Sequence, residues 1–234
     1  MWMKGIHGGD IYRNQVDMDF SVNINPLGVP KGLEAALYEA VGRCHEYPDM
    51  KASRLKQAVS SLLHVSEDHL LFGNGASEIF MGIVHGVRPK KTLIPVPSFY
   101  GYEYATKAVE SDIVYFPLKE ENDFLPKEDF LKVLTEDVDL LFLANPNNPT
   151  GQRMEKEYLK KLLTVCREKK ILVVLDECFI EFCGSGFSML SWIEEYDNLL
   201  LVHAFTKIYA IPGVRLGYLL CSNRLLLEKI TRNY

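Results

Sequence analysis

Lys207 is the residue whose type and surroundings are most suited to chemistry. It lies in segment 205–217, which reads FTKIYAIPGVRLG, among apolar and small residues, and Arg215 follows eight positions later. A lysine that is removed from water near a second cation has a lowered pKa and becomes a usable nucleophile. The alternative is a surface lysine whose aliphatic stem covers apolar neighbours. The apolar setting of Lys207 favours the nucleophile.

Two further polar groups follow apolar runs. Asp176 comes after five apolar residues, 171–175, and is expected to be a carboxylate at the mouth of a buried strand. Residues 147–151, which read NNPTG, follow another apolar run. A strand-end aspartate can instead be a helix cap or an ion-pair partner, and an Asn/Pro run can be only a turn. Taken alone, these residues leave both readings open.

A glycine turn at residues 73–78, GNGASE, also follows an apolar run. A glycine turn that leads into a helix presents backbone N–H groups and the positive end of the helix dipole, which together can bind a phosphate. Glycines at a strand–helix turn more often serve only the backbone geometry. The turn matches neither the Walker pattern nor GxGxxG.

The elements that position these groups alternate short apolar runs with amphipathic stretches. This rhythm is typical of parallel strands joined by crossover helices, and runs that are apolar throughout indicate a sheet covered on both faces. The predicted fold class is α/β, three-layer α/β/α with a mostly parallel sheet. The expected strands are 70–72, 92–95, 113–116, 140–143, 171–175, 199–202 and 216–220, and the expected helices are 33–43, 53–63, 76–87, 155–168 and 224–230.

Each of the motifs follows one of the expected strands. In open α/β sheets, ligands bind beyond the carboxyl ends of the strands. We therefore expect the motifs to form one site. Residues 1–30, rich in Gly, Asn and Asp, predict an extended N-terminal arm, and residues 31–234 predict one large domain.

Composition narrows the function classes. The chain has 234 residues, 47% hydrophobic and 24% charged, as in an ordinary globular protein. The net charge of −5 gives no reason to expect nucleic acid as a partner. The apolar runs are too short to cross a membrane, and the N-terminus lacks the apolar region of a signal peptide. Five cysteines without a CxxC pair predict reduced thiols in a cytoplasmic protein and do not support a metal site.

Taken together and in this order, the motifs resemble the fold-type I pyridoxal 5'-phosphate (PLP) enzymes of the class I/II aminotransferase family. The resemblance covers essentially the whole chain. It implies that Lys207 holds PLP as a Schiff base. It also implies that Asp176 pairs with the pyridinium nitrogen, and that Asn148 donates to the ring hydroxyl. Phe99, in the run PSFY, falls where the family stacks an aromatic side chain on the ring.

The resemblance also implies a phosphate-binding set and a dimer. The phosphate would be held by residues from three parts of the chain, namely Gly75, Ala76, Ser77, Thr206 and Arg215. Tyr47, in the run YPD, resembles the tyrosine that reaches the phosphate of the neighbouring subunit, so a homodimer with shared sites is expected. For Phe99 and Tyr47 the alternatives are an ordinary core phenylalanine and a tyrosine packed within its own subunit.

Two features are similar to one group of the family, the threonine-phosphate decarboxylases. The first is the arm, with HGGDIY at residues 7–12 and DFSVNINPLG at residues 19–28. The second is Phe179, because aminotransferases usually have a tyrosine there whose hydroxyl bonds the ring hydroxyl. In that group His7 would lie near the substrate phosphate and Asn23 near its carboxylate, although His7 could also be an exposed arm residue.

The expected activity is therefore PLP-dependent decarboxylation of L-threonine O-3-phosphate, a small phosphorylated amino acid, to an aminopropanol phosphate. The second reading is an aminotransferase such as the histidinol-phosphate enzymes, and the third is a PLP-fold protein that only binds. Two departures bear on these readings. Ala204 stands where the family usually has a hydroxyl residue, and the chain ends at Tyr234 where relatives continue into a small domain. We therefore expect the small C-terminal domain to be absent and this chain to be incomplete for catalysis.

Overall fold

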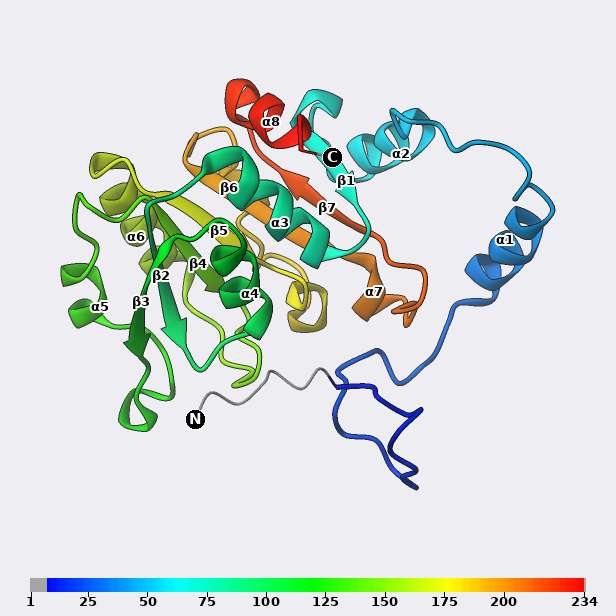
Figure 1. The fold of residues 1–234 in the computed structure, drawn as a ribbon, viewed down its shortest axis with the longest axis horizontal. Helices are drawn as coiled ribbons and strands as arrows, with labels where there is room; N and C mark the ends of the chain where they lie inside the picture. The colour runs from blue at the N-terminus through cyan, green and yellow to red at the C-terminus, as the bar shows by residue number, and fades with distance from the viewer. Residues whose placement is uncertain (1–7, 234) are drawn as a thin grey trace.

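A seven-stranded sheet forms the centre of the molecule in the computed structural model, which describes residues 8–233 (Figure 1). The strand order is β1-β7-β6-β5-β4-β2-β3. Strand β7 runs antiparallel to β1 and β6, and all other neighbouring pairs are parallel. The strands are β1 (Leu70–Gly73), β2 (Lys91–Val96), β3 (Asp112–Pro117), β4 (Leu140–Ala144), β5 (Leu172–Asp176), β6 (Leu199–Ala204) and β7 (Gly217–Leu220).

Helices cover both faces of this sheet. One face packs against α3 (Ala76–Val87), α4 (Tyr100–Ala108) and α8 (Arg224–Thr231). The other packs against α2 (Ser53–Leu63), α5 (Glu128–Lys132) and α6 (Lys156–Glu168). The predicted three-layer α/β/α fold with a mostly parallel sheet is confirmed. Short 3-10 helices complete the elements: η1 (Glu67–His69), η2 (Glu120–Asn122), η3 (Ile180–Cys183) and η4 (Leu190–Trp192).

The side-chain pattern explains these layers. Along β5, Val173 and Leu175 pack into the core on the α6 face, while Val174 packs into the core on the α3 face. A strand buried on both faces is apolar throughout, as the sequence indicated. Helix α6 buries one stripe, at the helical spacing of Leu159, Leu162, Leu163 and Cys166. All seven expected strands and all five expected helices are present, with ends that differ by at most two residues.

Three short helices were not predicted: α4, α5, and the four-residue α7 (Phe205–Ile208) that follows β6. In α4 the buried side includes Gly101, Ala105 and Thr106 beside Tyr102. Small and polar residues give a weak apolar stripe, so periodicity alone does not reveal such a helix. Helix α7 is shorter than any periodic pattern can show.

The N-terminal part of the chain lies beside the sheet rather than within the layers (Figure 1). Helix α1 (Lys31–Val41) has no buried residue, although all of its residues are described. Among the described residues, none before Val59 of α2 is buried. The predicted boundary between arm and domain at residue 30 stays a prediction. Within the described part of the chain, no helix combines the length and hydropathy needed to span a membrane.

Candidate active site

The carboxyl ends of three central strands bring the predicted catalytic groups to one edge of the sheet. The last residues of β4 and β5 are paired as Ala144 with Asp176, and Asp176 is paired with Val202 of β6. Helix α7, which carries Lys207, starts directly after β6. The loop with Asn148 follows β4 and is held by the Asn147 amide, which donates to the Pro97 carbonyl at 3.0 Å. Asn148, Asp176 and Lys207 therefore emerge at the same edge, as the motif spacing predicted.

Lys207 is half-buried at this edge. Burial lowers the pKa of its amine, and the nearby positive charge of Arg215 lowers it further, against opposing contributions from Cys178 and Asp176. Its Nζ lies 5.7 Å from the centroid of the Phe179 ring. A lysine in this setting gives up its proton more easily than a surface lysine, which a nucleophilic amine requires.

Asp176 is buried and held by two hydrogen bonds. The Tyr102 hydroxyl donates to its Oδ2 at 2.6 Å, and the backbone N–H of Cys178 donates to its Oδ1 at 2.9 Å. Burial and the neighbouring Asp176 charge raise the pKa of the Tyr102 hydroxyl well above its usual value, so this hydroxyl stays a donor. The two donors, one on each oxygen, fix the direction of this buried carboxylate. Asp176 can therefore hold a positive charge at the strand ends.

The Arg215 guanidinium lies against the start of α3. Gly75, the N-cap of this helix, has φ +81° and ψ 171°, a conformation that only glycine adopts freely. A Cβ placed on Gly75 would lie 2.6 Å from Nη2 of Arg215, so the guanidinium sits directly against the turn. Asn74 completes the turn by donating to the Glu78 carboxylate. A helix N-terminus beside a guanidinium is a suitable site for a phosphate group.

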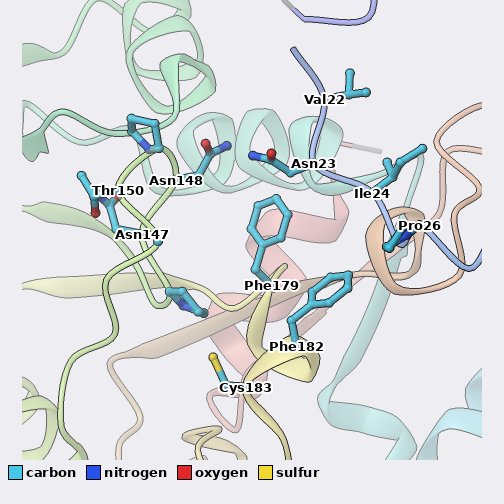
Figure 2. A pocket seen from close by; sticks show the side chains of 13 residues that line it. Val22, Asn23, Ile24, Pro26, Asn147, Asn148, Thr150, Phe179, Phe182 and Cys183 are labelled. Carbon is cyan, nitrogen blue, oxygen red and sulfur yellow. The ribbon is translucent and has the colours of Figure 1, made fainter. Parts of the chain in front are cut away.

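A cavity of about 630 Å³ is lined by the arm, the loop after β4, and Phe179, Phe182 and Cys183 (Figure 2). Asn23 enters it from the arm and Asn148 from the loop after β4, and in Figure 2 their amides face one another above the Phe179 ring. Phe179 both lines this cavity and lies near the Lys207 amine, so one side chain connects the cavity with the lysine. The lining residues are Val22, Asn23, Ile24, Pro26, Pro146, Asn147, Asn148, Pro149, Thr150, Gly151, Phe179, Phe182 and Cys183.

Most of the predicted site residues lie at this edge, and three need separate mention. Ser77 is exposed on the first turn of α3, next to the half-buried Ala76. Tyr47 is fully exposed on the connection between α1 and α2, and no hydrogen bond, ion pair or ring contact among residues 8–233 joins it to Arg215. His7 lies outside the described residues.

Phe99 and Thr206 are placed by their neighbours. Phe99 is the N-cap residue of α4, and its ring lies over Gly101, where a Cβ would approach the ring to 2.3 Å. Thr206 is buried in the first turn of α7, directly before Lys207. The cofactor-binding roles that the resemblance implies for Phe99 and Thr206 stay predictions.

Sequence reasoning missed two residues of the site. Tyr102, which donates to Asp176, lies in a helix that was not predicted, and Asn25 of the arm bonds the backbone of α7. The position of Tyr102 three residues after Phe99 was the one available signal, because neighbouring turns of a helix share a face. For Asn25 the contact spans 183 positions, and no local pattern announces it.

The donor set fits PLP. An amine of lowered pKa, a buried carboxylate with two donors and a guanidinium at a helix N-terminus match the aldehyde, pyridinium and phosphate groups of that cofactor. Among residues 8–233 no cluster of three or more His, Cys, Asp or Glu side chains is arranged to hold a metal ion.

Comparisons with known proteins agree with this chemistry. A protein of Caldanaerobacter subterraneus subsp. tengcongensis, provisionally named threonine-phosphate decarboxylase, is 40% identical over 217 residues, which are 91% of this chain and 58% of the relative. Threonine-phosphate decarboxylase of Salmonella typhimurium is 34% identical over 92% of this chain and 59% of its own length. The chain thus spans about three-fifths of the length of these curated relatives.

Solved structures show the same fold. A histidinol-phosphate aminotransferase from Clostridium acetobutylicum superposes with a TM-score of 0.83 at 34% identity, over 92% of this chain and 63% of the other. L-threonine-O-3-phosphate decarboxylase from Porphyromonas gingivalis superposes with a TM-score of 0.78 at 26% identity, over 90% and 62% of the two chains. The model of the family "Aminotransferase class I and II" matches residues 15–232. The chain therefore belongs to the class I and II aminotransferase family, whose enzymes use PLP as their cofactor.

Proposed function

We propose that the protein is a PLP-dependent decarboxylase that converts L-threonine O-3-phosphate to an aminopropanol phosphate and CO2. The observation that carries this proposal is Phe179, whose ring lines the cavity and has its centroid 5.7 Å from Nζ of Lys207. Phenylalanine at this position is what the resemblance to threonine-phosphate decarboxylases led us to expect. The two curated relatives at 40% and 34% identity carry that name, one of them provisionally.

Each cofactor group has a proposed partner. Lys207, with its lowered pKa, binds the aldehyde carbon through its neutral amine. Asp176 faces the pyridinium nitrogen, Asn148 the ring hydroxyl, and Phe99 the ring face. The phosphate would lie at the start of α3. It would be held there by Arg215, Gly75, Ala76, Ser77 and Thr206.

The chemistry requires that the bond from Cα to the carboxyl carbon breaks, that CO2 leaves, and that a proton is added at Cα. PLP, when bound, supplies the electron-poor ring that takes up the electron pair left on Cα. Asp176 would pair with the nitrogen of that ring, because two donors hold its buried carboxylate in one orientation. Lys207, released when the substrate amine takes its place, supplies the proton at Cα.

Substrate binding is proposed for the cavity. Asn23 lies opposite Asn148 (Figure 2). An amino acid in the cavity would therefore meet one amide from the arm and one from the loop after β4. We propose that Asn23 binds the substrate carboxylate. His7 is proposed to lie near the substrate phosphate. A cytoplasmic location, expected from the cysteine pattern, stays a prediction.

The second candidate is an aminotransferase. In that reaction Lys207 would move a proton from Cα of the substrate to C4' of the cofactor, instead of adding a proton at Cα after CO2 has left. The superposition on the Clostridium acetobutylicum enzyme, with 34% identity and a TM-score of 0.83, favours it. The two activities differ in the bond that is broken at Cα. The chain covers 58% and 59% of the two curated relatives, and the resemblance implies that further substrate contacts lie in the rest.

The test is a product assay on the natural full-length protein with PLP. L-threonine O-3-phosphate is supplied in one arm, and histidinol phosphate with 2-oxoglutarate in the other, with a Lys207→Ala variant as the control. We expect CO2 from the first arm and little glutamate from the second, both dependent on Lys207. Rapid glutamate formation with little CO2 would establish the aminotransferase instead.

We also propose a homodimer in which Tyr47 serves the phosphate site of the neighbouring subunit. Helix α1 has no buried residue, and large apolar side chains around it are exposed, namely Tyr38, Val41, Tyr47 and Met50. An apolar surface of this kind indicates a protein partner. In a two-fold dimer each subunit donates the same residue to the other.

Subunit mixing tests this proposal. A Tyr47→Phe variant and a Lys207→Ala variant of the full-length enzyme, each inactive alone, are combined under conditions where subunit exchange is demonstrated. A shared site predicts that mixed dimers regain one site with both wild-type residues, so activity rises. Absence of recovery after exchange would place Tyr47 in its own subunit or outside the chemistry.

A further inference from the structure

Tyr102 is a fully buried tyrosine whose hydroxyl meets Asp176. It lies in the apolar cluster between α3, α4 and the sheet, and its hydroxyl donates to Oδ2 of Asp176 at 2.6 Å. Phenylalanine would fill the same space, so packing alone does not require the hydroxyl. A buried hydroxyl costs free energy unless it is hydrogen-bonded, and here the single partner is the carboxylate proposed to face the cofactor.

The ring of Tyr102 is held from several directions. It stacks on Phe142, with centroids 5.0 Å apart and an angle of 10° between the planes. Phe80 and Phe99 make edge contacts with it at 5.1 and 5.7 Å. A ring fixed in this way holds its hydroxyl in one direction, so the position of the hydroxyl does not depend on Asp176 alone.

The Tyr102 hydroxyl acts as a hydrogen-bond donor to Asp176. Burial and the neighbouring Asp176 charge raise the pKa of Tyr102 well above its ordinary value, so it donates over the whole working pH range. The N–H of Cys178 donates to the other carboxylate oxygen, Oδ1, at 2.9 Å. With one donor on each oxygen the carboxylate cannot rotate without losing a hydrogen bond. Each oxygen retains a second lone pair for another partner.

We propose that Tyr102 is a positioning residue that orients Asp176 toward the ring nitrogen of PLP. The inference rests on the proposed role of Asp176 in cofactor binding and deepens it. Tyr102 also touches Phe99, the residue proposed to lie on the ring face. One buried side chain thus links the group that faces the ring nitrogen with the group that stacks on the ring.

The test compares two cofactors in the Tyr102→Phe variant. One is PLP, and the other is 1-deaza-PLP, in which a carbon replaces the ring nitrogen and nothing is left for Asp176 to bind. Dissociation constants are measured by absorbance for the wild type and the variant, without any assay of turnover. Tyr104→Phe is the matched control, because it removes an exposed hydroxyl from the same helix.

We expect Tyr102→Phe to weaken PLP binding by about tenfold, as for one hydrogen bond to a charged group, and 1-deaza-PLP binding by less than about twofold. Tyr104→Phe should change neither constant. An equal loss for both cofactors would show that Tyr102 only supports packing and would overturn the inference. Unchanged PLP binding in Tyr102→Phe would overturn it as well.

A second measurement separates this inference from the proposed function. In an Asp176→Asn background, Tyr102→Phe should change PLP affinity by less than about twofold, because the interaction it supports is already lost. If the wild type binds PLP and 1-deaza-PLP equally well, the role proposed for Asp176 is wrong and the inference falls with it. If the wild type prefers PLP and Tyr102→Phe keeps the full preference, only the role of Tyr102 is wrong.

Discussion

The backbone N–H of Asn25 donates to the carbonyl oxygen of Lys207 at 3.0 Å. The side-chain amide of Asn25 donates to the next carbonyl, that of Ile208, at 2.8 Å. The arm is therefore fastened to the helix that carries the proposed cofactor lysine, and its residues 22–24 and 26 line the cavity. Through this contact the N-terminal arm and the lysine are positioned together.

Replacing Asn25 should loosen the arm. Asn25→Ala removes the bond to Ile208 and the acceptor for the Leu27 N–H, two interactions of about 1 kcal/mol each. We expect cleavage within residues 10–24 by a dilute protease to become about tenfold faster. Asn14→Ala is the control, because the Asn14 side chain bonds only within the arm, to the Asp10 carbonyl. Equal cleavage rates in wild type and Asn25→Ala would show that another contact holds the arm.

Gly75→Ala should disturb phosphate binding specifically. The new methyl group would meet the Arg215 guanidinium at 2.6 Å and displace it from the start of α3. We expect PLP to bind about tenfold more weakly, while pyridoxal, which lacks the phosphate, binds almost as before. The measurement is the pair of dissociation constants.

Gly184→Ala is a matched control for this substitution. Gly184 has φ +85° and ψ −173°, close to the backbone conformation of Gly75, so alanine brings similar strain. A Cβ on Gly184 would have no heavy atom of the described residues within 4 Å. If the two variants lose the same PLP affinity, backbone strain and not Arg215 explains the effect.

His203 should make stability fall as the pH rises. It is buried at the end of β6, with Nε2 3.2 Å from Glu177 and Nδ1 3.3 Å from Glu181. Burial alone would lower its pKa, but the two carboxylates outweigh burial and raise the pKa to about 9 from 6.5. Between pH 6.5 and pH 9, His203 is therefore protonated in the folded state and neutral in the unfolded state. The His203 contribution is complete below pH 6.5 and is lost as the pH rises through 9.

Denaturant unfolding at several pH values tests this expectation. The free energy of unfolding of wild type should fall with pH more steeply than that of His203→Gln, by at most about 1.4 kcal/mol per pH unit. His45→Gln, at an exposed histidine, should keep the wild-type slope. Parallel slopes for wild type and His203→Gln would mean that His203 is not charged in the folded protein.

Strong local patterns made most of the fold predictable. Every strand carries a continuous apolar run, and α6 shows its buried stripe in the sequence. The direction of β7, antiparallel to its neighbours, was not visible because a short apolar run is the same in either direction. Helix α4 was missed because its buried side includes small residues such as Gly101 and Ala105.

The site was predictable where its residues follow strands directly. Asp176 and Lys207 belong to this group, since a strand end fixes their place at the sheet edge. Tyr102 and Asn25 were not predictable, because their contacts with Asp176 and Ile208 are made across 74 and 183 positions. Long-range contacts of this kind depend on the packed fold rather than on local sequence.

Borohydride reduction tests directly whether Lys207 binds the cofactor. The protein is incubated with PLP, reduced, digested and mapped by mass spectrometry, with Lys207→Ala treated in parallel. The half-buried amine of lowered pKa predicts a single pyridoxyl adduct on the peptide that contains Lys207, and none in the variant. A stoichiometric adduct on another lysine, or equal labelling of Lys207→Ala, would show that Lys207 does not bind the cofactor.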